Sequence, residues 1–366
     1  MTGAMYAGIS GLKSHMNKLN VIGNNIANVN TYGYKTARTT FREAIYTTMT
    51  AGSDGTDLVG GTNPSQIGYG CNIGTIDLDM SNGPAVPTGV NLDCMIQGDG
   101  FFLVGDKSKV SPENLDSLNL TKVGNFHFDK SGYLVDGYGR VVHGFVTVAG
   151  TTDQNTGKFT PGQAGPEKGE GSLGISTELV PIRLPLAAQK DADDGSYKKG
   201  DPIYPGAPNG TNVDSTEQDL VDGKTTVAVN VDSISVDKTG KIKATTEGGD
   251  VITIGYIALG KVENPAGLTH LDGPYYQAMG GAGNVAVTTA GGAVTGNLSN
   301  VQDGVDGAVR IVGSENSLLS GFLEGSGTDL ATEFSEMITT QRGYQANTRI
   351  VTVTDSMLEE LVNMKR

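Results

Sequence analysis

The side chains that could bind a metal ion or perform catalysis are few and far apart in this sequence. Zinc and related metals need several His, Cys or carboxylate ligands at short spacings. No such partner stands at ligand spacing from any of the four histidines, which are His15, His127, His143 and His270. The Gly-x-Ser-x-Gly and His-Glu-x-x-His motifs are absent, as is the Gly-x-x-x-x-Gly-Lys-Ser/Thr phosphate loop. We therefore predict a protein that is not an enzyme and that has no catalytic residue, metal or cofactor.

Three segments resemble ligand-binding loops only in part. Residues 68–74 miss the dinucleotide-binding spacing of glycines by one residue. Residues 153–157 and 191–195 resemble the start of a calcium loop, but each places its Gly one position early. The twelfth position of each loop, where calcium binding needs a Glu, holds Ala164 or Pro202. Turns explain the three segments better than ligand sites do.

Cysteine chemistry is equally limited. Cys71 and Cys94 are too few for a disulfide framework and show no metal-ligand pattern. We expect both to be ordinary buried small residues. A single bridge between them stays open.

The charge of the chain argues against a nucleic-acid partner. The net charge is −14 at pH 7, whereas a protein that binds phosphates presents a basic surface. Residues 1–50 nevertheless carry a net charge of +4, so this end should meet a different environment from the acidic remainder. The 366 residues suffice for two or three domains, and 54 Gly with no Trp favour small, turn-rich sheets.

No part of the sequence predicts insertion into a membrane. A run of about 18 apolar residues, which a spanning helix needs, is absent. Residues 1–11 carry no charged side chain and lead into no continuous apolar run, unlike a secretory signal peptide. If the protein leaves the cell, we expect export without a cleaved signal peptide.

Residues 1–28 show the period of an amphipathic helix. Apolar residues recur every seven positions, and a second set falls four positions after the first, which is typical of helices that pack along one another. The first set is Met5, Leu12, Leu19 and Ile26, and the second is Ile9 and Met16.

Residues 327–366 predict a second helix, preceded by the capping oxygens of Ser326, Thr328 and Asp329. Its seven-residue series is Leu330, Met337, Tyr344, Val351 and Leu358. The second seam position holds Phe334, Gln341, Thr348, Asp355 and Val362. Because this position is half polar, we expect the helix to pack in a bundle of many like chains. An intramolecular hairpin of the two terminal helices remains the alternative.

Between the helices the apolar period changes from 3.6 to 2, which predicts strands. Residues 129–132 and 237–240 each separate two strand-like runs with turn-forming Asp and Gly. The alternation over 227–236 changes phase at 232–233, which predicts a β-bulge. A further alternation spans 252–256.

The predicted organisation is therefore multidomain. The N- and C-terminal α-helices should pair in a coiled-coil-like inner core, with mainly-β outer domains. The expected parts are a helical core domain (1–28 and 327–366), an extended connecting segment (29–70), a β-rich middle domain (71–145 and 250–326) and an inserted β- and loop-rich outer domain (146–249).

Four segments resemble those of a known family. They are residues 21–35 (VIGNNIANVNTYGYK), 92–102 (LDCMIQGDGFF), 121–134 (TKVGNFHFDKSGYL) and 341–358 (QRGYQANTRIVTVTDSML). Together they resemble the bacterial flagellar rod and hook proteins, although Cys94 stands where the family usually has an aliphatic residue. The family-like residues at the junction after the first helix are Asn24, Asn25, Asn28, Asn30, Gly33 and Lys35, and those early in the last segment are Gln341 and Arg342.

The resemblance, which covers about residues 1–145 and 250–366, implies a self-polymerising axial protein of the flagellum. It implies export through the flagellar type III apparatus, an extracellular location, and terminal helices that line the inner tube. It also implies contacts with the distal rod, the hook cap and the hook–filament junction proteins. The length and the outer insertion favour a hook subunit, a universal joint, over a distal rod subunit. A secreted adhesin and a secreted carbohydrate-active enzyme remain rivals from other classes.

Overall fold

The computed structural model divides the chain into two compact units. Unit 1 comprises residues 1–80 and 326–366, and unit 2 comprises residues 81–325. The described residues are 2–54, 60–107, 115, 117–152, 159–161, 173–176, 179–188, 198–204, 228–292, 296–297, 310–313 and 315–364.

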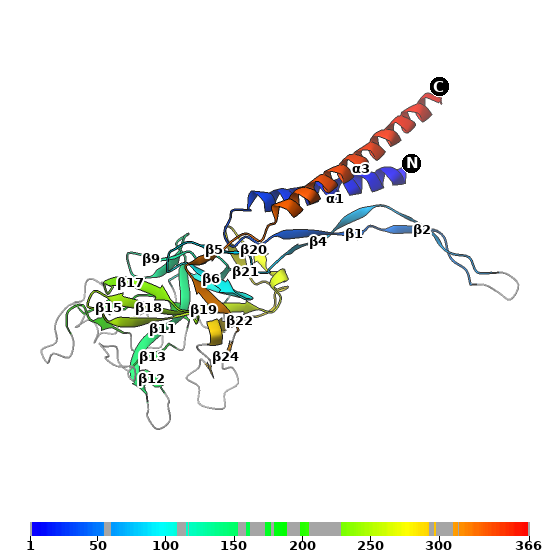
Figure 1. Cartoon of the computed structure of the whole chain (residues 1–366). Coiled ribbons are helices and arrows are strands. Elements are labelled where there is room, and N and C mark those ends of the chain that lie inside the picture. The colour runs from blue at the N-terminus through cyan, green and yellow to red at the C-terminus, as the bar shows by residue number, and fades with distance from the viewer. Residues whose placement is uncertain are drawn as a thin grey trace. The chain divides into compact units, whose positions relative to one another are not determined.

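Unit 1 contains two long helices and a narrow β-ribbon (Figure 1). The helices are α1 (Thr2–Ala27) and α3 (Leu330–Met364). The ribbon consists of two antiparallel strand pairs, which are β1 (Ala37–Glu43) with β4 (Cys71–Leu78) and β2 (Tyr46–Thr50) with β3 (Ser65–Gly68). Backbone hydrogen bonds of Ala44 with Gly70, and of Tyr69 with Ile45, join the two pairs into one continuous ribbon.

Local polar chemistry sets the ends of the helices. The Asp329 carboxylate precedes α3 and accepts hydrogen bonds from the Ala331 N–H at 3.0 Å and the Thr332 hydroxyl at 2.7 Å. The bond from Ala331 satisfies one of the backbone N–H groups that the first turn of a helix leaves unpaired. After α1, Gly33 adopts a φ of 69°, a left-handed conformation that suits glycine, and the chain turns into the ribbon.

Unit 2 is built mainly of β-strands. Sixteen strands of its described residues form one sheet, with the main path β20-β21-β8-β7-β11-β19-β22-β24-β23. The elements are β5 (Ala85–Pro87), β6 (Cys94–Gln97), β7 (Gly100–Gly105), β8 (Asn119–Thr121), β9 (Phe126–Phe128), β10 (Leu134–Asp136), β11 (Val141–Thr152), β12 (Phe159–Pro161), β13 (Leu173–Ile175), β14 (Val180–Pro181), β15 (Leu186–Ala187), β16 (Pro202–Ile203), β17 (Val231–Val236), β18 (Lys241–Thr246), β19 (Val251–Val262), a 3-10 turn (Pro265–Gly267), β20 (Thr269–His270), β21 (Tyr275–Gln277), β22 (Val285–Thr289), a second 3-10 turn (Ala290–Gly292), β23 (Gly296–Asn297), β24 (Arg310–Gly313), β25 (Ser317–Ser320) and β26 (Phe322–Glu324).

The long strands β11 and β19 pair antiparallel at the centre of the sheet. The core contains fully buried aromatic and aliphatic side chains, among them Phe102, Ile96, Leu134, Ile242 and Ile257. Two pairings close unit 2 between segments far apart in the sequence: β5 pairs with β26, and β6 pairs with β25.

Both predicted hairpins and the predicted bulge are confirmed. Residues 129–132 connect β9 to β10, and residues 237–240 connect β17 to β18. In each turn the Gly N–H donates to the Asp carbonyl oxygen at 2.9 Å. The β17–β18 register shifts between Val231 and Ser233, at the place where the apolar alternation changes phase, although Val227 lies outside the described residues.

The boundaries of the predicted insertion stay a prediction. Strands β17 and β18 fall within 146–249, yet they continue the sheet through β19. The two calcium-loop-like segments lie outside the described residues. Residues 68–74 run from the end of β3 into β4. Both cysteines are free: Cys94 is buried, as predicted, which raises the pKa of its thiol to about 12, whereas Cys71 is only half-buried.

Candidate assembly surface

The described residues contain no group of three or more His, Cys, Asp or Glu side chains that could hold a metal ion. Within the same part of the chain, none of the helices has the length and apolar character required to cross a membrane. The candidate functional surface lies instead on unit 1, the unit of two helices and a ribbon, which exposes many large apolar side chains.

The two terminal helices pack against each other in opposite directions. Along α1, Gly8 faces Val351, Gly11 faces Asn347, and farther on Gly343 faces His15. A Cβ at Gly11 would lie 2.7 Å from the Asn347 amide nitrogen, so the absence of a side chain permits the close approach. The intramolecular hairpin, which the sequence left open as the alternative, therefore exists within one chain; a coiled-coil core shared between chains stays a proposal.

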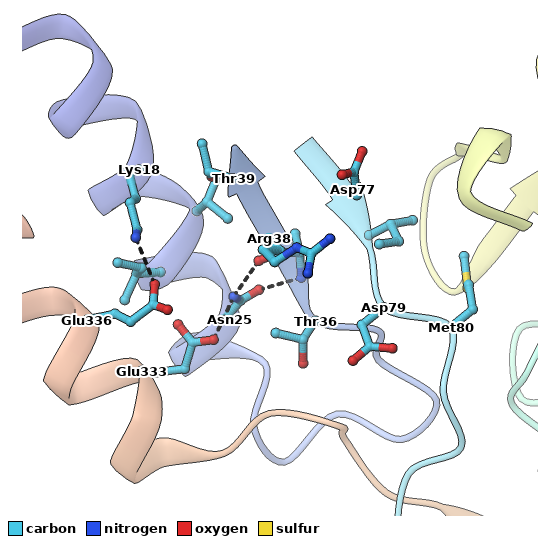
Figure 2. A pocket seen from close by; sticks show the side chains of 14 residues that line it. Lys18, Asn25, Thr36, Arg38, Thr39, Asp77, Asp79, Met80, Glu333 and Glu336 are labelled. Carbon is cyan, nitrogen blue, oxygen red and sulfur yellow. Dashed lines mark hydrogen bonds and ion pairs between the residues drawn. The ribbon is translucent and has the colours of Figure 1, made fainter. Parts of the chain in front are cut away.

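A buried asparagine joins both helices to the ribbon (Figure 2). The Asn25 amide nitrogen donates to the Ala37 carbonyl oxygen and to the Glu333 carboxylate, both at 2.9 Å. Its amide oxygen accepts from the Ala37 N–H at 3.1 Å and from the Tyr34 hydroxyl at 2.9 Å. All hydrogen-bonding capacity of the amide is used, so Asn25 fixes the positions of α1, β1 and α3 together.

Burial also changes the acidity of the groups around Asn25. It raises the pKa of the Glu333 carboxyl, an effect that exceeds the opposing hydrogen bond from Asn25. It also raises the pKa of Tyr34, with a further contribution from the Glu333 charge. One turn along α3, Glu336 forms an ion pair with Lys18 at 3.0 Å.

A cavity of about 390 Å³ lies beside this cluster, between the two helices and the ribbon (Figure 2). Charged side chains of both signs line it, among them Lys18, Arg38, Asp77, Glu333 and Glu336. Such a mixed lining suits polar contacts and water better than an apolar ligand.

The predicted residues of the first helix divide into two groups. Met5, Leu12, Leu19 and Ile26 are half-buried, whereas Ile9 and Met16 are exposed. The residues nearest to α3 or the ribbon form a 3-4 series of mostly small or polar residues, namely Gly8, Gly11, His15, Lys18, Ile22 and Asn25. A search for small residues at the same spacing could have found this series, which the search for apolar residues missed.

The predicted residues of the second helix divide in a similar way. Met337, Tyr344, Val351 and Leu358 are half-buried, and they alternate with buried or half-buried polar residues, which are Glu333, Thr340, Asn347 and Thr354. Leu330, Phe334, Gln341, Arg342 and Val362 are exposed.

The junction residues form local contacts. The Asn28 amide donates to the Asn24 backbone and side-chain oxygens at 3.0 Å each. Lys35 is buried, and its ammonium donates to the Met80 carbonyl oxygen at 3.4 Å. Asn30 is exposed, and Gly33 is buried in the turn after α1.

Large apolar side chains are exposed on both helices and on the ribbon of unit 1. Towards the end of α3, five of them follow one side of the helix, and we call them the α3 stripe: Ile350, Val353, Met357, Leu361 and Met364. On the ribbon the exposed residues include Ile45, Met49 and Ile67. Contiguous exposed apolar surface is typical of interaction sites.

Comparison with known proteins agrees with the family resemblance. Residues 5–35 match the model of the flagella basal body rod protein family, and residues 319–364 match the flagellar basal body rod FlgEFG protein C-terminal model. The flagellar basal-body rod protein FlgG of Bacillus subtilis is 33% identical over 366 residues, with 100% of both chains covered. The flagellar hook protein FlgE of Borreliella burgdorferi is 26% identical over 451 residues, again with 100% of both chains covered.

Among solved structures, the Helicobacter pylori flagellar hook protein FlgE2 aligns with 55% of this chain and 95% of its own, at 12% identity and a TM-score of 0.28. That likeness is too weak to support an argument. The 33% identity with the Bacillus protein over the full length of both chains, and the family-model matches at both ends, suffice to assign the family. The chain belongs to the family of flagellar basal-body rod and hook proteins, which are structural components of the flagellum.

Proposed function

We propose that the chain is the structural subunit of the flagellar hook, a curved and flexible tube that transmits torque from the motor to the filament. The observation that carries this proposal is the uncovered apolar surface of unit 1. Both terminal helices are paired within one chain, yet the α3 stripe still faces solvent. A second copy is the partner that a self-assembling subunit always has available.

In this proposal the helix pairs of many copies pack side by side and form the inner wall of the tube. Exposed residues of the predicted seams, such as Ile9, Met16, Phe334 and Val362, then become buried between copies. Full burial of one such side chain contributes about 1.5–3 kcal/mol. Burial of several such residues per subunit offsets part of the cost of association.

The strand-rich unit 2 forms the outer layer of the proposed tube. Its apolar residues are mostly buried in its own core, so its contacts with neighbouring copies are polar and can slide. Sliding contacts let one side of the tube shorten while the other lengthens, which a universal joint requires. No catalytic step enters this function, and the protein is proposed not to be an enzyme.

The proposed partners follow from a place in the flagellar axis. They are further copies of the chain, the distal rod below, the hook cap during growth, and the hook–filament junction proteins above. The proposed route out of the cell is the flagellar type III apparatus, without a cleaved signal peptide.

A second candidate is the distal rod subunit, which forms a stiff drive shaft. The Bacillus relative, which is named a rod protein and is 33% identical, favours the distal rod subunit. Hook proteins of three species, which align over nearly the whole chain at 26–27% identity, favour the hook subunit. The two candidates differ in the shape of the polymer.

The test is electron microscopy of the polymer assembled from the purified chain. Curved tubes that change curvature with salt or temperature support the hook subunit, and straight rigid rods support the distal rod subunit. A chain that forms no tube under any assembly condition, with or without a seed of native flagellar axes, would exclude both.

A further inference from the structure

One face of the ribbon is covered in part by the first helix. The Ser10 hydroxyl of α1 donates to the Tyr69 carbonyl oxygen of the ribbon at 3.3 Å. Farther along, the ring of Phe41 in β1 lies 5.7 Å from the ring of His15 in α1. The helix therefore lies along the face of the ribbon to which Phe41 belongs.

The same face continues beyond the helix. Because side chains alternate between the two faces of a strand, Ile45 and Ile67 share the face of Phe41 and Tyr69. A Cβ at Gly3, in the first turn of α1, would lie 3.9 Å from the Tyr69 ring, which places the start of the helix there. Past this point the strand β2 extends beyond α1 (Figure 1), and Ile45 is 80% exposed and Ile67 48% exposed. We call Ile45, Ile67 and Tyr69 the ribbon face.

The α3 stripe has the chemistry to cover the ribbon face. Its five residues are 42–76% exposed and follow one side of the helix, with Glu360 at the edge of the stripe. The exposed large apolar residues of α1 offer a smaller surface, because they are only Tyr6, Ile9 and Met16 among the described residues of this helix.

The lack of charge on the ribbon face supports the same pairing. Residues 44–50 and 65–70 of the ribbon carry no charged side chain, so an uncharged surface meets an uncharged stripe. Around them, both surfaces carry charges of both signs, which are Arg38, Arg42 and Glu43 on the ribbon and Arg349, Asp355, Glu359 and Glu360 on the helix.

We propose that the ribbon face of one copy binds the α3 stripe of a second copy. The inference rests on the proposed function and names the surfaces that would join successive subunits. Since the two surfaces are different parts of the chain, the contact is heterologous and can repeat without closing, as a helical tube requires. The ribbon face then accepts two helices in line, its own α1 and the α3 of a neighbour.

The experiment is site-specific cross-linking in assembled tubes. Ile67→Cys and Leu361→Cys are combined in a Cys71→Ser background, while Cys94 stays because it is fully buried. A short bis-maleimide is added after assembly, and the products are separated on a denaturing gel. We expect a ladder of covalent multimers that contains most of the chains, because each copy links its neighbour.

Two matched controls change one position each. Gln66→Cys replaces Ile67→Cys and lies on the opposite face of β3, and Glu359→Cys replaces Leu361→Cys and lies on the far side of α3. Tubes of either control should give mainly monomer. If the first pair does not assemble, Ile45→Cys with Met357→Cys tests the same contact.

The outcomes separate the contact from the function. Tubes of both test pairs without a ladder, or control ladders of equal strength, overturn the proposed contact and leave the proposed function standing. Failure of the unmodified chain to form tubes overturns the proposed function itself.

Discussion

The two units of this chain differ in how far they bury their apolar residues. In unit 2 the strand β7 is buried along its whole length, and its core residues are 0–8% exposed. In unit 1 the only buried hydrophobic side chain among the described residues is Ile22. All exposed large apolar side chains of the described residues lie in unit 1 except Val90, Tyr138, Val251 and Met279.

This difference indicates which unit is complete by itself. A unit that buries its apolar surface gains its stability from its own core, whereas a unit that leaves much of it exposed can gain further stability on association. Under the proposed function, the apolar residues that fold the chain and those that assemble it lie mainly in different units. Substitutions in the two units should therefore affect different measurements.

The largest effect on folding is expected from Phe102→Ala in unit 2. The Phe102 ring is fully buried and packs edge to face on Phe126 at 4.9 Å. Its removal should lower the free energy of unfolding by about 3–5 kcal/mol, measured by chemical denaturation. Val251→Ala, at a site 67% exposed, is the control and should change it by less than about 0.5 kcal/mol. Equal effects at the two sites would contradict a self-sufficient core.

The opposite result is expected from Leu361→Asp in unit 1. The free energy of unfolding should change by less than about 0.5 kcal/mol, because Leu361 is 42% exposed in the single chain. Assembly should fail, since a carboxylate buried between copies costs several times that amount. Sedimentation of assembled protein measures the loss, and Glu359→Asp should assemble normally. Leu358→Asp is less informative, because Leu358 is already half-buried in the single chain.

A smaller effect is expected from Asn25→Ala. The substitution leaves the Ala37 N–H and the Glu333 carboxylate without their buried partner, at a cost of about 1–3 kcal/mol. Circular dichroism at 222 nm during thermal unfolding should show the terminal helices melting earlier, while the sheet of unit 2 melts as before. Asn20→Ala, at an exposed site on the same helix, should leave both transitions in place.

The smallest effect is a pH dependence at Glu333. Because burial raises the pKa of this carboxyl, the folded state binds its proton more tightly than the unfolded state does. The site therefore adds stability to unit 1 below the unfolded pKa, and this stability is lost as the pH rises through the folded pKa. Glu333→Gln should remove this pH dependence. The terminal helices of the variant should therefore gain stability relative to those of the parent as the pH rises from acidic to neutral. A constant difference between the two proteins over that range would exclude this role.

Features set by short segments could be predicted from the sequence. The turns at 129–132 and 237–240 need only an Asp, a Gly with positive φ and flanking strands, and all three are readable locally. The cap at Asp329 is local for the same reason. The two terminal helices followed from their period.

Features set by distant neighbours could not be predicted. Gly8 and Gly11 of α1 allow a close approach of Val351 and Asn347 of α3, and only the structure shows that these residues are neighbours. The buried Lys122 in unit 2 is a further example, because its ammonium donates to the Gly98 carbonyl oxygen at 2.9 Å. A lysine predicts an exposed position unless the structure supplies such a partner.

The pairing of β5 with β26 and of β6 with β25 has a consequence for the order of events in biosynthesis. Each pairing joins segments more than 200 residues apart, since Cys94 pairs with Ser320 and Val86 with Leu323. The Asn25–Glu333 hydrogen bond spans an even longer separation. Neither unit can complete its contacts until the ribosome has made residues 317–333. Before then, the pairings whose strands all precede residue 317 can form, among them the local hairpins, which form in microseconds. The closure of these long loops comes last, and contacts so far apart in sequence are slow to form.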